Sequence, residues 1–123
     1  EPNKAMIIDE PDRIAKMREE FEAALGEEIE ISISKPQFLE FTHKRANKGE
    51  ALEHLAKLNN IPRDRVIAIG DSYNDISMIQ YAGLGVAMGN APDDVKYCAD
   101  YITGNHDDNG VAQAISKFVL NGR

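Results

Sequence analysis

The segment 65–83, RVIAIGDSYNDISMIQYAG, constrains the fold more than any other part of the chain. It begins with four consecutive apolar residues, 66–69, a pattern typical of a strand that is covered on both faces. A glycine ends this run, and Ser72 with Asp75 three residues later makes a capping-box pattern at the start of a helix predicted over 73–82. A buried strand followed directly by a helix predicts an α/β fold with a doubly wound parallel sheet.

Polar side chains gather where this strand gives way to its helix. Asp71, Asn74 and Asp75 all lie there, and open α/β sheets bind their ligands outside the carboxyl ends of the strands. Carboxylates in this place either cap the helix or hold a hard cation, since Mg²⁺ prefers oxygen ligands and often shares them with a phosphate. From these residues alone, capping and metal binding are about equally good interpretations.

The two ends of the chain have different apolar patterns. Apolar and polar residues alternate strictly over 28–34 and again over 38–42, which predicts an antiparallel sheet with one exposed face and with Phe38 on its covered side. With a strand over 4–9 and a helix over 11–25, this makes an α+β region. Beyond it, the predicted helices span 48–59, 73–82, a segment from Pro92 and 110–120, and the predicted strands span 66–69, 84–88 and 101–102. We therefore expect two domains, 1–46 and 47–123.

Composition excludes several classes of protein. The net charge of −7 argues against a nucleic-acid surface, because phosphate backbones are bound by clustered Lys and Arg. No apolar run approaches the ~20 residues that span a bilayer, and no signal-peptide pattern opens the chain, so no membrane partner is expected. The single cysteine, Cys98, rules out an internal disulfide framework and fits a reducing compartment. These features predict a cytoplasmic protein.

Lys48 occupies a position that local energetics disfavour. Asn47 can cap the predicted helix with Glu50 completing the box, which makes Lys48 the first helical residue. There the helix macrodipole opposes a cation by ~0.3–1 kcal/mol. A phosphate bound between Lys48 and the Asp71 loop would offset this penalty, and a solvated lysine that tolerates it is the alternative.

Two motifs in order resemble those of a known family. NKGEAL (47–52) followed by IGDSYNDISMIQYAG (69–83) resembles motifs III and IV of the haloacid dehalogenase superfamily. The segments FLEFTHKRANKGEAL (38–52), AGLGVAMGNA (82–91) and DDNGVAQAI (107–115) are similar to its Cof-type branch of sugar-phosphate phosphatases. The resemblance implies that 47–123 is the C-terminal half of a Rossmann-like hydrolase core and that 1–46 is part of an α+β cap domain.

The resemblance also implies a role for each candidate residue. Lys48 would bind the transferring phosphoryl group and screen the nucleophile, and Asp71 would ligate a catalytic Mg²⁺. Asn74 would contact phosphate, and Asp75 would support the metal shell. Lys48 and Asp71 are thus the catalytic candidates, Lys48 and Asn74 the phosphate-binding ones, and Asp71 and Asp75 the metal site.

One part of the family pattern is missing from the sequence. These phosphatases attack with an aspartate in an Asp-x-Asp-Gly-Thr motif, which does not occur in the 123 residues. The nearest approach is IIDEPD (7–12), where Asp9 ends an apolar strand but Pro11 stands in place of the second aspartate. Because the chain also starts at Glu1 without methionine, we expect a fragment that is inactive alone. Its partner would be the missing N-terminal half or another copy of the chain.

These inferences combine into one functional expectation. The parent protein is expected to be a Mg²⁺-dependent phosphatase that hydrolyses small phosphorylated metabolites, chiefly sugar phosphates, through an aspartyl-phosphate intermediate. A phosphomutase on the same scaffold is one alternative. A non-catalytic binding or assembly module is the other, if the chain is naturally this short.

Overall fold

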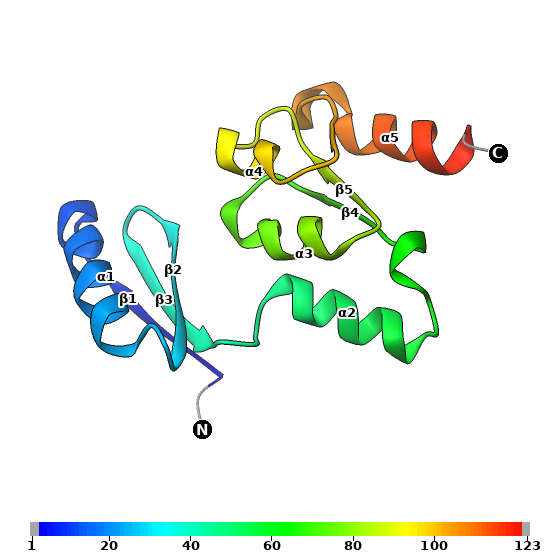
Figure 1. Cartoon of the computed structure of the whole chain (residues 1–123). Helices are drawn as coiled ribbons and strands as arrows, with labels where there is room; N and C mark the ends of the chain where they lie inside the picture. The colour runs from blue at the N-terminus through cyan, green and yellow to red at the C-terminus, as the bar shows by residue number, and fades with distance from the viewer. Residues whose placement is uncertain (1–2, 122–123) are drawn as a thin grey trace. The chain divides into compact units, whose positions relative to one another are not determined.

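The computed structural model describes residues 3–121, and the chain divides into two compact units (Figure 1). Unit 1 is Glu1–Ala46 and unit 2 is Asn47–Arg123.

Unit 1 is a three-stranded antiparallel sheet with one helix. Its elements are β1 (Lys4–Ile8), α1 (Pro11–Leu25), β2 (Ile29–Lys35) and β3 (Phe38–His43). The strand order is β1-β3-β2, so the last strand of the unit lies in the middle of the sheet. The antiparallel sheet predicted from strict alternation is confirmed.

The core of unit 1 lies between α1 and one face of this sheet. Ile14 of α1 is fully buried together with Leu39 of β3, and the Phe41 ring meets the Phe21 ring edge-on with centroids 5.1 Å apart. Phe38 is only half-buried and lies outside this core, with the Lys35 ammonium 5.5 Å from its ring centre. The prediction for Phe38 is wrong because neighbouring residues of a strand face opposite sides, and Leu39 takes the covered side.

Unit 2 contains a parallel sheet, as the sequence predicts. Its strand order is β4-β5-β6. The strands are β4 (Ile67–Gly70), β5 (Leu84–Ala87) and β6 (Tyr101–Ile102). The α-helices are α2 (Lys48–Leu58), α3 (Ile76–Tyr81), α4 (Asp93–Tyr97) and α5 (Gly110–Ile115). Short helical turns complete the unit at η1 (Arg63–Arg65), η2 (Tyr73–Asp75), η3 (His106–Asp108) and the π-helical η4 (Ser116–Leu120).

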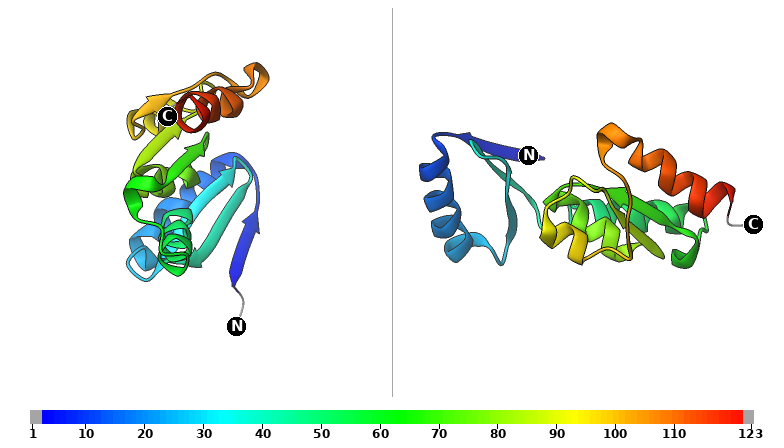
Figure 2. Two further views of the ribbon diagram at one scale, coloured as in Figure 1. Left: turned by 90° about the vertical axis from the view of Figure 1, so that its right-hand side faces the viewer. Right: turned by 90° about the horizontal axis from the view of Figure 1, so that it is seen from above.

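Helices cover both faces of the parallel sheet. Figure 1 and the left view of Figure 2 both place α3 and α5 on opposite sides of β4 and β5. On the α3 side, Ala68 of β4 and Ala87 of β5 are buried, in separate clusters that also take in α2 and α4. On the α5 side, the Phe118 ring meets the Tyr101 ring edge-on with centroids 5.0 Å apart. Because the helices cover the two faces, the carboxyl ends and the amino ends of the strands lie at two uncovered margins of the sheet.

Within residues 3–121, no helix is both long and apolar enough to cross a membrane.

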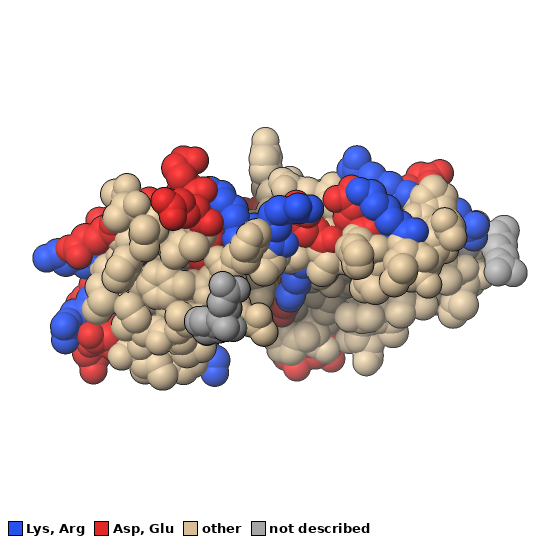
Figure 3. Space-filling model, turned by 90° about the horizontal axis from the view of Figure 1, so that it is seen from below, with Lys and Arg blue, Asp and Glu red and all other residues tan. Residues whose placement is uncertain are grey.

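On the face drawn in Figure 3, acidic and basic side chains are interspersed.

Candidate functional site

Lys48 begins α2, as the sequence predicts. The Asn47 side chain accepts a hydrogen bond from the Glu50 backbone N–H at 2.9 Å and caps the helix. The Lys48 ammonium forms an ion pair with Oδ1 of Asp75 and lies 3.4 Å from Oδ1 of Asn74. Three residues predicted from two separate motifs are therefore in contact, although Lys48 and Asn74 are 26 positions apart in the sequence.

Asp75 is a buried carboxylate at the start of the helix after β4, with 4% of its surface exposed. Its Oδ2 accepts hydrogen bonds from the backbone N–H groups of Asp71 and Ser72, both at 2.9 Å, and completes the predicted capping box. Burial alone would raise the pKa of Asp75, but the hydrogen bonds from Lys48 and the two N–H groups outweigh it, so that its pKa is lowered. Asp75 is thus held as an anion.

The Asp75 carboxylate also offsets the unfavourable interaction of the Lys48 cation with the helix macrodipole. A cation on the first residue of a helix is opposed by the macrodipole, and here a buried anion stands beside it. The position of Lys48 is therefore explained within the chain. It does not by itself require a phosphate.

Asp71 is exposed and is oriented by one hydrogen bond on each carboxylate oxygen. Oδ1 accepts from the Ser72 hydroxyl at 3.2 Å, and Oδ2 accepts from the Asn90 amide group at 3.1 Å. A carboxylate oxygen has two lone pairs, so each can still face a cation. Among residues 3–121 no cluster of three His, Cys, Asp or Glu side chains could hold a metal. A Mg²⁺ ion fits this donor set, since it keeps several waters and takes one or two carboxylates together with substrate phosphate.

Two glycines allow the site to be this tight. A Cβ atom on Gly49 would lie 2.6 Å from the Ser77 carbonyl oxygen, so α2 and α3 cross closely only because position 49 has no side chain. A Cβ atom on Gly70 would lie 2.7 Å from the Asp75 carboxyl carbon. Both distances are shorter than any normal contact, and the glycines therefore let Lys48 and the end of β4 approach Asp75.

Asp9, the nearest sequence approach to a nucleophile, follows β1 in unit 1. Its Oδ1 accepts a hydrogen bond from the Glu10 backbone N–H at 2.8 Å, and its Oδ2 lies 3.2 Å from the Arg13 guanidinium. These contacts place Asp9 just before α1, whose N-cap is Glu10, as an ordinary helix-start residue.

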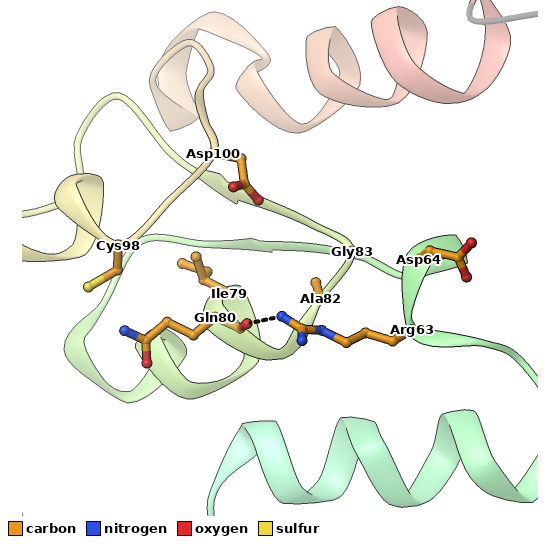
Figure 4. A pocket seen from close by; sticks show the side chains of 8 residues that line it. All are labelled: Arg63, Asp64, Ile79, Gln80, Ala82, Gly83, Cys98 and Asp100. Atoms are coloured by element: carbon orange, nitrogen blue, oxygen red, sulfur yellow. Dashed lines mark hydrogen bonds between the residues drawn. The ribbon is translucent and has the colours of Figure 1, made fainter.

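A hollow of about 640 Å³ lies at the other edge of the parallel sheet (Figure 4). It is lined by residues that precede the amino ends of the strands and by two residues of α3: Arg63, Asp64, Ile79, Gln80, Ala82, Gly83, Cys98 and Asp100. The Arg63 guanidinium points to the end of α3 and donates to the carbonyl oxygens of Gln80, at 2.9 Å, and Tyr81. Its hydrogen bonds fix the end of a helix, and none of the candidate residues lines the hollow.

The sequence reasoning did not single out Asn90 or the Ser72 hydroxyl as contacts of Asp71. A signal for Asn90 was available, because it follows the strand next to β4 and parallel neighbours present their carboxyl ends at one edge. The Ser72 hydroxyl was considered only as a helix cap.

The family of haloacid dehalogenase-like hydrolases matches this chain over residues 1–115. YxeH, a Bacillus subtilis protein, is 38% identical over 117 residues, which are 95% of this chain and 43% of that protein. The 5-amino-6-(5-phospho-D-ribitylamino)uracil phosphatase YcsE, also from Bacillus subtilis, is 47% identical over 95 residues, 77% of this chain and 38% of YcsE. The chain thus spans less than half the length of these relatives.

A solved structure with the same fold is that of BT4131, described as a subclass IIB sugar phosphatase of the haloacid dehalogenase superfamily. It aligns with a TM-score of 0.80 at 30% identity and covers 94% of this chain and 42% of BT4131. The parallel sheet with helices on both faces is therefore part of the haloacid dehalogenase-like fold.

Proposed function

This chain belongs to the haloacid dehalogenase-like hydrolases, and from that premise we propose that the protein carrying it is a Mg²⁺-dependent phosphatase. Its substrates would be small phosphorylated metabolites, sugar phosphates first among them. The names of YcsE and BT4131 support this choice, since one is a phosphatase of a phosphorylated ribityl compound and the other a sugar phosphatase.

The main support for the proposal is that four residues meet in a junction at the carboxyl end of β4: Lys48, Asn74, Asp75 and Asp71. It brings a cation, an amide and an exposed carboxylate to one place where an open α/β sheet binds ligands. Phosphoryl transfer depends mostly on positioning and on positive charge around the phosphoryl oxygens. The junction offers both.

Each residue has a separate task in the proposed site. Lys48 has three N–H donors, of which Asp75 and Asn74 accept two, so the third can bind a phosphoryl oxygen. The Asn74 amide donates to the phosphate from the same side. Asp75 holds Lys48 in place and fixes the loop through two backbone N–H groups.

Asp71 is the proposed direct ligand of Mg²⁺. Asp75 belongs to the metal site as a supporting residue, because it is buried, its Oδ2 accepts two loop N–H groups and its Oδ1 is paired with Lys48. When bound, Mg²⁺ supplies positive charge to the oxygens of the transferring group. The family resemblance assigns the attack to an aspartate in an Asp-x-Asp-Gly-Thr motif, which the 123 residues do not contain, and we propose that this chain alone is inactive.

A partner is part of the proposal. Among the described residues, β4 pairs with β5 on one side only, and Ile67 on β4 is 36% exposed. Val111, Ile115 and Val119 are spaced four residues apart on α5 and η4 and are 41–48% exposed. An open strand edge and an apolar stripe favour association. We propose that the remainder of the complete protein covers them, or otherwise a second copy of this chain.

We place the protein in the cytoplasm as a further part of the proposal. Its support is the single Cys98, which fits a reducing compartment.

The metal assignment is tested by Asp71→Asn in the complete protein that carries this chain. The substitution keeps the shape of the side chain but removes the charge, and we expect Mg²⁺-dependent hydrolysis of p-nitrophenyl phosphate to fall by a factor of about 10² or more. Asp93→Asn is the matched control, since Asp93 is an exposed aspartate in the first turn of α4. Unchanged activity with unchanged Mg²⁺ dependence in Asp71→Asn would refute the metal assignment.

A further inference from the structure

Asn90 lies in the turn after β5 and bridges two segments that the proposed function does not connect. Its Nδ2 donates to Oδ2 of Asp71 at 3.1 Å, and its Oδ1 accepts from the backbone N–H of His106 at 3.0 Å. Gly70 and Ala87 are register partners at the ends of β4 and β5, so the turns that follow leave the sheet at the same edge. Asn90 therefore ties the segment before α5 to the carboxylate after β4.

The two contacts require an asparagine side chain in this orientation. A carboxylate oxygen can only accept a hydrogen bond and a backbone N–H can only donate one. The amide group satisfies both at once, with its NH₂ toward Asp71 and its oxygen toward His106. A hydrophobic side chain would make neither bond, and an aspartate would set a second negative charge against Asp71.

The segment that Asn90 holds is itself packed against the end of β5. The Gly89 N–H donates to the Gly104 carbonyl oxygen at 3.1 Å, and the buried Thr103 hydroxyl donates to the Gly110 carbonyl oxygen at 2.7 Å. A Cβ atom on Gly89 would lie 2.5 Å from Oδ1 of Asn105, so the two turns touch closely. One end of the Asn90 bridge is therefore anchored in the fold.

We propose that Asn90 is a positioning residue for the metal ligand Asp71. An exposed carboxylate on a loop is free to rotate, and its hydrogen bonds from Asn90 and Ser72 hold both oxygens of Asp71 in one orientation. This rests on the proposed function, in which Asp71 binds Mg²⁺. It adds that the His106 segment and the metal site are coupled through one side chain.

The expected effect follows from how outer partners act on metal ligands. Removing a group that orients a ligand typically weakens metal binding by about 10- to 100-fold. Because Asn90 provides one of two orienting bonds and is itself exposed, we expect Asn90→Ala to weaken metal binding by about tenfold, near the lower limit. The fold should be kept.

The test measures metal binding directly in the complete protein that carries this chain. Free Mn²⁺ is followed by electron paramagnetic resonance during titration of the wild type, Asn90→Ala, Asn105→Ala and Asp71→Asn, with thermal unfolding recorded for each. Asn105 is the matched control because it lies in the same packed segment and donates to Asp108, at 3.2 Å, without bonding Asp71. We expect weaker Mn²⁺ binding in Asn90→Ala, wild-type binding in Asn105→Ala and similar unfolding temperatures.

A second measurement follows the bridge itself. The backbone N–H resonance of His106 is expected to shift when Mg²⁺ is added to the wild type, since its acceptor also bonds the metal ligand. In Asn90→Ala this response is expected to disappear.

Three results would overturn the proposal. Mn²⁺ binding within twofold of the wild type in Asn90→Ala would show that Asn90 does not orient the ligand. Equal weakening in Asn90→Ala and Asn105→Ala would assign the effect to general order of the segment. Unaltered Mn²⁺ binding in Asp71→Asn would refute the metal site itself, which distinguishes failure of the proposed function from failure of this inference alone.

Discussion

Each unit contains a lysine paired with a partly or fully buried carboxylate, and the surroundings of the two pairs differ. In unit 1, Lys4 lies 2.5 Å from Oε2 of Glu40, with 46% and 14% of the two side chains exposed. In unit 2, Lys48 pairs with Asp75, with 49% and 5% exposed. The hydrogen bond from Lys4 lowers the pKa of Glu40, and the pKa of Asp75 is lowered as well, so neither property separates the pairs.

The difference lies in what holds the carboxylate. Glu40 sits on a strand, and its two hydrogen-bonding partners, Lys4 and Ser34, are flexible side chains. Asp75 is fixed by two backbone N–H groups at a strand end, beside the exposed Asp71. An ion pair is therefore ordinary surface chemistry in one unit and part of a candidate site in the other. The two pairs differ in whether backbone N–H groups hold the carboxylate in place.

The largest predicted difference between the pairs is in catalysis. Lys48→Met in the complete protein should lower kcat/KM for p-nitrophenyl phosphate by about 10²- to 10³-fold, because it removes a positive charge from the transferring group. Lys4→Met, the matched change in unit 1, should leave kcat/KM unchanged. Equal losses in both variants would mean that Lys48 has only a structural role.

A smaller difference is predicted in stability. Asp75→Asn should lower the free energy of unfolding by about 2 kcal/mol, since a buried carboxylate loses its bond to Lys48 and weakens those to the loop. Glu40→Gln should cost less than about 1 kcal/mol, because flexible side chains and no backbone N–H groups bond the Glu40 carboxylate. Urea unfolding at pH 7 measures both. Equal costs would contradict the comparison.

The Asp75 contribution should also depend on pH in a definite direction. Its pKa in the folded protein is lowered from the ordinary value of an aspartate, so between the two pKa values the unfolded chain binds more protons. The contribution is then complete above about pH 5 and is lost as the pH falls through the folded pKa. The difference between wild type and Asp75→Asn should shrink below pH 4 in the same urea experiment.

The smallest predicted difference concerns association of the 123-residue chain. Val119→Glu should weaken self-association by about fivefold, because it removes about 1 kcal/mol of apolar burial at the proposed contact. Ile8→Glu is the control, since Ile8 is also an exposed apolar side chain, at 67%, but belongs to unit 1. Sedimentation velocity over a range of concentrations measures both. A larger effect of Ile8→Glu would place the contact on unit 1.

Local sequence patterns predicted the secondary structure closely because they depend on near neighbours. The apolar run before Gly70 gave a parallel strand, and Asn47 before Lys48 gave a capped helix that begins at Lys48. The strand that contains Phe38 was predicted correctly, but the face on which its side chain lies was not. An alternating pattern separates the two faces of a strand without showing which face packs against the helix. The motifs placed Lys48 and Asp75 in one site, but they did not predict an ion pair between the two side chains.

The sequence by itself determined the elements, the family and the residues of the candidate site, because capping, alternation and motif order are written in consecutive residues. Only the tertiary structure decided their partners. It showed that Asp75 balances Lys48, that glycines at 49 and 70 leave room for this pair, and that Asn90 holds Asp71. The physical reason is that these contacts join residues up to 28 positions apart, which meet only once the sheet and its helices have packed.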